Sequence, residues 1–231
     1  MTEIRNKEIQ DTIMVLPDDY VANKQDIAYF KSYDGCDDYV IYEHLIEKIW
    51  GYVKSHYYNL DSIGDRVLGG SVSVLSVNSG SGKVLEQAPK NTIITAYNND
   101  YTCKRITDFV CQDRALEGKY FSEFKDISQF FALENTNSSR KYDIVITQPV
   151  DGFKFYKDID KDEELTKGTP IEYYTHRSLH FVEQNGLLIV LCPKEKVSEV
   201  SNGSYFPIKE IVEIKNKMIT SYVAVIIQKG R

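Results

Sequence analysis

The sequence predicts an α/β protein built on a mostly parallel β-sheet with helices on both faces. Three observations favour this fold class. Apolar, strand-like runs alternate with segments of helical spacing along most of the chain, as expected for parallel strands joined by helices. Several runs are continuously apolar and β-branched, such as Ile144, Val145 and Ile146, which indicates strands buried on both faces. The last two runs are joined by a short connection, which predicts an antiparallel final strand.

Residues 1–39 are predicted to form an N-terminal extension with short helices, ahead of one α/β domain at residues 40–231. Within the extension, Pro17, Asp18 and Asp19 interrupt the chain and indicate a turn between two short elements. Residues 40–58 are expected to form the first helix of the domain, because apolar side chains recur there at three- and four-residue steps. Asp37 or Asp38 is expected to cap this helix.

Seven segments are predicted as strands, because each is short, apolar and rich in β-branched or aromatic side chains. They are residues 72–77, 92–97, 127–131, 142–147, 187–193, 209–214 and 221–230. Further helices are expected to begin near Lys83, to cover residues 102–110, and to lie within residues 170–186, with Gly186 as the C-terminal stop. Asn216 and Lys217 are the expected turn between the last two strands.

The charge of the chain bears on its partners. The formal net charge is −6 and the pI is about 5.3, so the average surface repels phosphate. This argues against tight, unaided binding of nucleic acid, and any action on DNA would need a partner subunit. No apolar stretch approaches the length of a membrane span and no signal peptide is recognised. We therefore expect a cytoplasmic protein without membrane contact.

Cysteine and histidine usage predicts no metal site. The cysteines lack a CxxC pair and are expected to be reduced and structural. They are Cys36, Cys103, Cys111 and Cys192. His176 and His180 would share one face of a helix, but no glutamate completes an HExxH pattern around them.

A glycine-rich turn follows the strand predicted at residues 72–77. It contains Asn78, Gly80 and Gly82, and Lys83 follows it. The GSGK sequence is similar to part of a phosphate-binding loop, but that motif needs a glycine where Val77 stands and a hydroxyl residue where Val84 stands. Binding of a nucleoside triphosphate is therefore rejected. The GSG turn is also not GxGxxG, which argues against a nicotinamide-dependent dehydrogenase.

Polar residues follow two other predicted strands. Asn98 and Asp100 come directly after residues 92–97, and Gln148 and Pro149 come directly after residues 142–147. Pro149 ends its strand, because proline has no N–H to donate to a sheet. Since parallel strands end at one edge of the sheet, these residues are candidates for an active-site loop and its surroundings.

Taken together, these motifs resemble the adenine-N6 DNA methyltransferase family. The resemblance rests on the strand that ends in Gln148, Pro149, Val150 and Asp151, on the turn with Gly80 and Gly82, and on the order of elements over roughly residues 40–229. It implies the class I methyltransferase fold, which is Rossmann-like, and S-adenosylmethionine as the cofactor. It also implies DNA methylation of the kind found in restriction–modification.

The resemblance implies a set of cofactor-binding residues. Gly80 and Gly82 match the family's Asp-Pro-x-x-Gly-x-Gly turn, in which Asn78 also lies. Ser76 stands where the family has an acid, so a charge-assisted contact would become a weaker neutral one. Asn98 stands where the family has the acid that binds the ribose. Either Asp100 replaces that acid or these residues form only a helix-capping turn.

The resemblance also implies catalytic positions, at which the family has Asn-Pro-Pro followed by Tyr or Phe. Gln148 keeps an amide oxygen but adds a methylene, Val150 replaces a proline, and Asp151 replaces the ring on which a flipped base stacks. Two hypotheses remain open. The chain is an inactive pseudo-methyltransferase that acts through binding or assembly with a protein partner or oligomer. Alternatively, it is a divergent active methyltransferase for adenine N6 or another amino group, without its own target-recognition domain.

Overall fold

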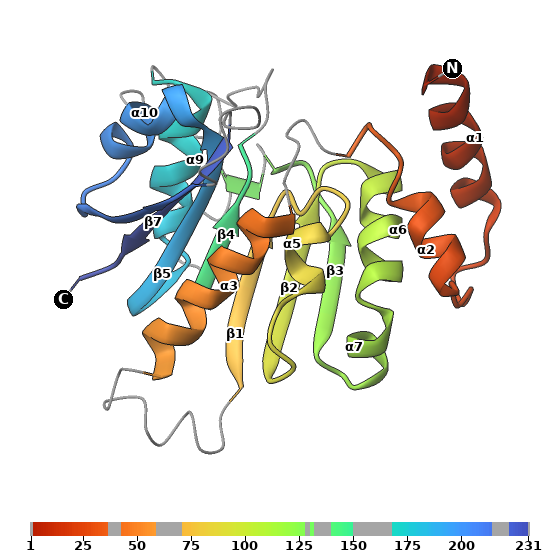
Figure 1. The fold of residues 1–231 in the computed structure, drawn as a ribbon, viewed down its shortest axis with the longest axis horizontal. Coiled ribbons are helices and arrows are strands. Elements are labelled where there is room, and N and C mark those ends of the chain that lie inside the picture. The colour runs from red at the N-terminus through yellow and green to blue at the C-terminus, as the bar shows by residue number, and fades with distance from the viewer. Residues whose placement is uncertain are drawn as a thin grey trace.

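The structure is a computed structural model of the chain and describes residues 2–36, 43–58, 71–127, 130–131, 140–149, 168–213 and 222–230. These residues contain a seven-stranded sheet in the order β3-β2-β1-β4-β5-β7-β6 (Figure 1). β7 is antiparallel to both β5 and β6, and the other neighbouring strands are parallel. The predicted mostly parallel sheet with an antiparallel final strand is confirmed.

The strands are β1 (Val72–Val77), β2 (Thr92–Asn98), β3 (Tyr120–Phe124), β4 (Tyr142–Thr147), β5 (Val182–Pro193), β6 (Ile208–Val212) and β7 (Tyr222–Gln228). The helices are α1 (Thr2–Val15), α2 (Lys24–Phe30), α3 (Glu43–Tyr58), α5 (Lys83–Glu86), α6 (Tyr101–Val110), α7 (Gln112–Leu116), α9 (Pro170–Leu179), the short η3 (Lys194–Lys196) and α10 (Val197–Asn202). Across the described ranges, no helix is both long and apolar enough to cross a membrane.

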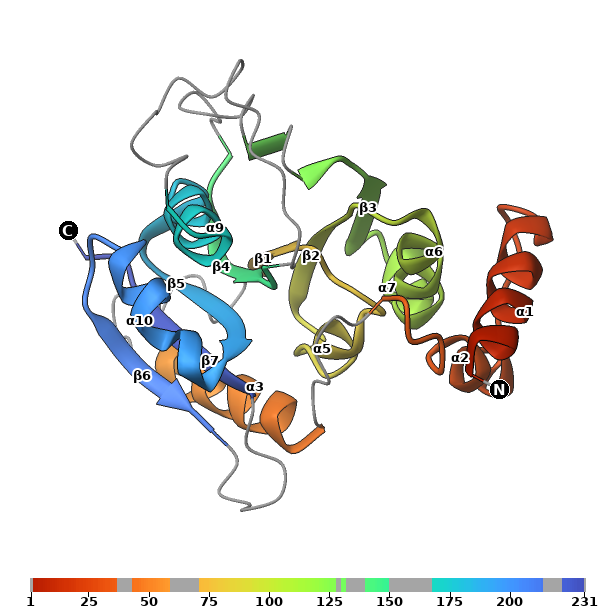
Figure 2. The same ribbon diagram turned by 90° about the horizontal axis from the view of Figure 1, so that it is seen from above.

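Helices cover both faces of the sheet (Figures 1 and 2). Alternate side chains of a strand point to opposite faces, so Val74 of β1 joins the core under α3 and α5. Its neighbour Leu75 joins the core under α9 and α10. This arrangement buries the central strands on both sides, which is why they read as continuous apolar runs.

The N-terminal helices α1 and α2 pack on α6 through a separate apolar cluster. Its members are Ile9, Ile13, Ala22, Phe30, Cys36, Cys103, Ile106 and Phe109. Cys36 and Cys103 form a disulfide within this cluster, so the expectation of reduced cysteines is wrong for this pair. Cys111 and Cys192 are free and buried. The predicted domain boundary and the capping residues Asp37 and Asp38 lie outside the described residues.

The third strand lies earlier in the chain than predicted. β3 is Tyr120–Phe124, whereas Ile127, Phe130 and Phe131 are helical and buried against the α9 face of the sheet. A short apolar run has the same composition in a buried strand and in a buried helical turn, and periodicity alone does not separate the two.

Gly186 is not the stop of a helix, as the sequence had indicated. α9 ends at Leu179, and Gly186 lies inside β5, where an added Cβ would be 2.7 Å from the carbonyl oxygen of Asp143. Asn185 has a φ of 64° and the β4–β5 register shifts between Tyr142 and Ile144. The glycine is therefore needed where an irregular strand passes close to its neighbour. The predicted turn at Asn216 and Lys217 lies outside the described residues.

Candidate functional site

The loop that follows β1 has an unusual backbone. Asn78, Gly80 and Gly82 all have positive φ angles, of 59°, 56° and 77°. Glycine adopts this region without steric cost and asparagine tolerates it, so the sequence provides suitable residues at each position. The loop turns sharply over the carboxyl edge of the sheet and enters α5 at Lys83, as predicted.

Hydrogen bonds tie this loop to the strands on either side of β1. The backbone N–H of Ser79 donates to the carbonyl of Tyr97 in β2 at 3.2 Å. The side-chain amide of Asn78 donates to the carbonyl of Gln148, after β4, at 3.1 Å. The N–H of Gln148 in turn donates to the carbonyl of Val77 at 3.2 Å. The ends of β2, β1 and β4 are thus held together as one polar edge.

Asn98, the last residue of β2, presents an unsatisfied acceptor at this edge. Its side chain is 1% exposed and its Nδ2 donates to Thr107 Oγ1 of α6 at 3.1 Å. Its Oδ1 is buried and has no hydrogen-bond partner within the described part of the chain. A buried acceptor without a donor is costly, by about 1–3 kcal/mol. A ligand hydroxyl placed here would remove that cost.

Asp100 has a structural role in the same turn. Its carboxylate accepts the N–H of Cys103 at 2.8 Å and caps the N-terminus of α6. The capping interpretation of this turn therefore holds for Asp100, and one of its carboxylate oxygens is engaged. Its substitution for a ribose-binding acid stays a prediction.

The end of β4 carries two more buried polar atoms without partners among the described residues. Gln148 is 2% exposed and Thr147 is fully buried. Gln148 Nε2 and Thr147 Oγ1 both lack a hydrogen-bond partner there. Pro149 is also buried, whereas Val150 and Asp151 lie outside the described residues. Two of the four predicted catalytic positions are thus placed at the polar edge.

Ser76 lies one residue further inside than the polar edge. It is 1% exposed, within β1, and pairs in register with Ala96 of β2 and Ile146 of β4. The sequence did not single out Thr107 or Thr147. Neither threonine lies in a recognisable motif, so nothing in the local pattern marked either residue.

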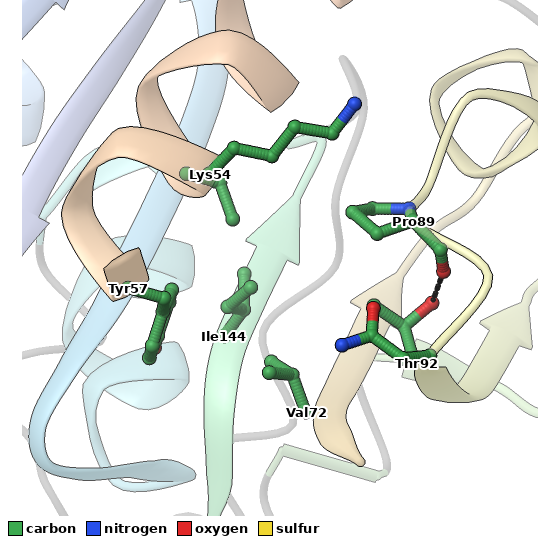
Figure 3. A pocket seen from close by; sticks show the side chains of 8 residues that line it. Lys54, Tyr57, Val72, Pro89, Thr92 and Ile144 are labelled. Carbon is green, nitrogen blue, oxygen red and sulfur yellow. Dashed lines mark hydrogen bonds between the residues drawn. The ribbon is translucent and has the colours of Figure 1, made fainter. Parts of the chain in front are cut away.

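A small cavity lies at the opposite, amino edge of the sheet. Figure 3 shows Lys54 and Tyr57 of α3 on one side and Pro89 and Thr92 on the other, with Val72 and Ile144 between them. Its volume is about 40 Å³, room for only a few water molecules. This cavity is too small for a nucleoside. The carboxyl edge is the candidate site because Asn98, Thr147 and Gln148 each have a buried polar atom there without a partner among the described residues.

The histidine pair has no metal-binding arrangement. His176 and His180 have ring centroids 5.2 Å apart, and no group of three metal-binding side chains occurs in the parts of the chain that the structure describes. Burial lowers the pKa of His180 to about 4, and the nearby His176, Arg177, Lys141 and Lys229 act in the same direction. His180 is therefore neutral near pH 7 and packs at the C-terminal end of α9.

Comparisons with known proteins place the fold. No protein-family model matches the sequence, and no curated protein matches it. Many solved structures resemble this chain. One is a protein of Listeria monocytogenes assigned to the class I S-adenosylmethionine-dependent methyltransferases, with a TM-score of 0.55 and 12% identity over 100% of this chain and 88% of that one.

Two further structures are similar to this chain. The N-methyltransferase NodS of Bradyrhizobium japonicum WM9, in complex with S-adenosyl-L-homocysteine, has a TM-score of 0.54 and 9% identity over 98% of this chain and 99% of that one. A protein of Streptococcus mutans assigned as an S-adenosylmethionine-dependent methyltransferase has a TM-score of 0.51 and 13% identity. That match covers 68% of this chain and 44% of the other.

Proposed function

We propose that this chain, which has the class I methyltransferase fold, binds S-adenosylmethionine, or the product S-adenosylhomocysteine, at the carboxyl edge of β1, β2 and β4. In open α/β sheets, ligands bind outside the carboxyl ends of the strands, where the strand order reverses. Here the order reverses between β1 and β4, next to the left-handed loop at residues 78–82.

One observation carries this proposal, namely the buried Oδ1 of Asn98, which has no donor among the described residues. A ribose hydroxyl is the kind of donor that would satisfy it, at the strand end where the family resemblance places the ribose. The contact is neutral, because Asn98 replaces an acid, and a charge-assisted hydrogen bond is roughly twice as strong as a neutral one. We therefore expect weaker cofactor binding than an acid at this position would give.

The fit of the cofactor to the other residues supports the same site. Gly80 and Gly82 have positive φ angles in this loop and carry no Cβ, a property that allows a ligand close approach to the backbone. Gln148 Nε2 is a buried donor without a partner among the described residues, so a ligand acceptor would satisfy it. When bound, S-adenosylmethionine supplies a methyl group on a positively charged sulfur. The protein's own residues bind and orient it.

A second candidate function is methyl transfer to an amino group such as adenine N6. The buried amide of Gln148 at the site favours it, because an amide oxygen can accept a hydrogen bond from a target amino group. Among the described residues, the amide nitrogen of Gln148 is the atom without a partner, so the amide would have to turn by 180° about its last bond. The net charge of −6 would oppose unaided DNA binding, and a partner subunit would deliver the DNA.

Calorimetric titration with S-adenosylmethionine and S-adenosylhomocysteine tests the proposed binding. We expect binding that Asn98→Ala weakens and that Asn91→Ala, an exposed asparagine at the amino edge, leaves unchanged. No heat at millimolar cofactor would overturn the proposal. Asn98→Asp is expected to strengthen binding, because it restores a charged acceptor.

Methyl transfer from labelled cofactor to duplex and single-stranded DNA separates the two hypotheses on activity. Transfer that Gln148→Ala abolishes supports the enzyme, with the exposed Gln25→Ala as a matched control. Cofactor binding without transfer to any DNA supports a pseudo-methyltransferase that acts through binding or assembly. Transfer that Gln148→Ala leaves unchanged would remove Gln148 from the site.

A further inference from the structure

Thr107 lies in the middle of α6 and contacts two separate parts of the polar edge. It is fully buried, and its Oγ1 lies 3.1 Å from Nδ2 of Asn98 and 2.9 Å from the carbonyl oxygen of Gly80. Asn98 is nine residues away in sequence and Gly80 is 27. One hydroxyl thus joins the end of β2 to the loop after β1.

The contact with Asn98 determines which amide atom faces the site. A threonine hydroxyl offers two acceptor lone pairs and one donor, and Asn98 Nδ2 donates to one lone pair. The amide nitrogen is therefore held toward α6. The opposite atom, Oδ1, is left as the buried acceptor without a partner among the described residues. Without this contact, the amide would lose the interaction that fixes its orientation.

Thr107 also lies against both glycines of the loop at residues 78–82. The Thr107 hydroxyl can donate to the carbonyl of Gly80, or to the carbonyl of Cys103 one turn earlier, each at 2.9 Å. A Cβ added at Gly82 would lie 3.1 Å from Thr107 Cγ2 and 3.2 Å from its Cα. Gly82 therefore allows α6 to approach the loop closely, in addition to adopting a positive φ.

A threonine with a purely helical role would make only one of the three hydrogen-bond contacts of Thr107. A buried threonine in a helix commonly donates to the carbonyl four residues earlier, which is the Cys103 contact. That bond needs neither Asn98 nor Gly80. The two additional contacts join elements that a purely helical role would leave independent.

We propose that Thr107 is a positioning residue for nucleoside binding. It holds the Asn98 amide with its oxygen toward the ligand ribose and holds the Gly80 carbonyl at the base of the loop. This inference rests on the proposed binding of S-adenosylmethionine or S-adenosylhomocysteine. Thr107 touches no ligand atom in this scheme and acts through Asn98 and the loop.

Ligand pairs that differ only at the ribose test this role. Thr107→Val keeps the shape of the side chain and removes its hydroxyl, while Thr107→Ser keeps the hydroxyl. We expect Thr107→Val to weaken S-adenosylhomocysteine binding about ten-fold and to change binding of the 2′,3′-dideoxy analogue by less than about two-fold. Thr107→Ser should restore the wild-type value, and Thr102→Val, at another buried threonine of α6, should not weaken binding.

Two results would overturn the inference. One is equal weakening of both ligands by Thr107→Val, which would indicate a general effect on packing. The other is unchanged binding of S-adenosylhomocysteine. In an Asn98→Ala background, Thr107→Val should have less than about a two-fold effect, because the coupled partner is gone.

A measurement without ligand separates this inference from the proposed function. In NMR spectra of the ¹⁵N-labelled protein, the Asn98 side-chain amide protons should exchange slowly in the wild type and in Thr107→Ser, and faster in Thr107→Val. Equal exchange in all three would overturn the positioning role. Failure of the wild type to bind S-adenosylhomocysteine, with this exchange difference intact, would instead overturn the proposed function alone.

Discussion

The two edges of the sheet differ in how their polar groups are satisfied. At the amino edge, Asp143 Oδ2 accepts both the N–H and the hydroxyl of Ser73, at 2.9 and 2.7 Å, and the hydroxyl of Tyr57 donates to the carbonyl of Asp143 at 2.6 Å. At the carboxyl edge, Asn98, Thr147 and Gln148 each have a buried polar atom without a partner among the described residues.

This difference is the basis for placing the proposed ligand site at the carboxyl edge. Buried polar groups in folded proteins are nearly always hydrogen-bonded, so three neighbouring exceptions at one edge need a reason. A polar ligand at the carboxyl edge provides one. At the amino edge, with its small cavity (Figure 3), the carboxylate of Asp143 is satisfied by Ser73, although Nε2 of His56 in α3 is buried without a partner among the described residues.

The largest expected effect concerns the disulfide that anchors the extension to α6, near the carboxyl edge. Cys36 and Cys103 are separated by 67 residues, and in the loop-entropy model such a crosslink stabilises the fold by up to about 4 kcal/mol. The double variant Cys36→Ser, Cys103→Ser should lower the urea midpoint accordingly. Hydrogen exchange should rise in α6 and residues 78–82 but not at the amino edge. An equal rise at both edges would contradict the comparison.

Removing the acceptor at the amino edge tests the stabilising role of that edge. Asp143→Ala removes the acceptor of the N–H and the hydroxyl of Ser73, and we expect a loss of about 2 kcal/mol in the free energy of unfolding. Asp143→Asn, which keeps one side-chain oxygen, should lose less. Both variants should bind S-adenosylhomocysteine with wild-type affinity once folded. A change below about 0.5 kcal/mol in Asp143→Ala would show that this edge is not satisfied as described.

At the carboxyl edge, removal of a polar group is expected to raise the free energy of unfolding rather than lower it. Thr147→Val replaces a buried hydroxyl that lacks a partner among the described residues with a methyl of similar size, and we expect the ligand-free protein to gain about 1 kcal/mol. Ser73→Ala at the amino edge is the control and should lose stability. Thermal unfolding without ligand measures both. Destabilisation by Thr147→Val would indicate that the hydroxyl already has a partner.

The smallest expected effect is the pH dependence of the amino edge, where His180 lies beside the start of β5. Its folded pKa is about 4, against an ordinary value of 6.5. Between these pH values the unfolded chain binds more protons, so stability should fall as pH is lowered from 6.5 to 4, by roughly 1 kcal/mol because His180 is partly exposed. His180→Asn should flatten this slope in urea titrations at several pH values, and the exposed His44→Asn should not. A slope unaffected by His180→Asn would contradict this account.

Much of the fold could be predicted from the sequence. The helix at α3, the apolar strands β1, β2, β4, β5 and β7, and the antiparallel closing pair all follow from periodicity and composition. The predicted start of a helix at Lys83 is also confirmed. The third strand was predicted at the wrong residues because apolar and polar side chains do not alternate regularly between the two faces of β3. Phe121 and Phe124 are both about half exposed. The buried Ile127, Phe130 and Phe131 gave a stronger apolar signal.

The candidate site could be predicted only in part. Positions 78–82, 98 and 148 were candidates because each lies at the end of an apolar strand. Thr107 was not, since its partners lie on other elements and no local pattern encodes a contact across 27 residues. The disulfide was likewise missed, because Cys36 and Cys103 meet only after α2 packs on α6.

The sequence by itself determined the layered α/β architecture, because strand and helix periods are local consequences of where apolar side chains must face. It also determined the glycine-rich turn, since few residues tolerate positive φ. Only the tertiary structure decided which polar atoms remain unsatisfied. The amide nitrogen of Asn98 donates to Thr107, and its Oδ1 is a buried acceptor without a partner among the described residues. Whether a buried polar atom has a partner depends on every chain segment that folds against it.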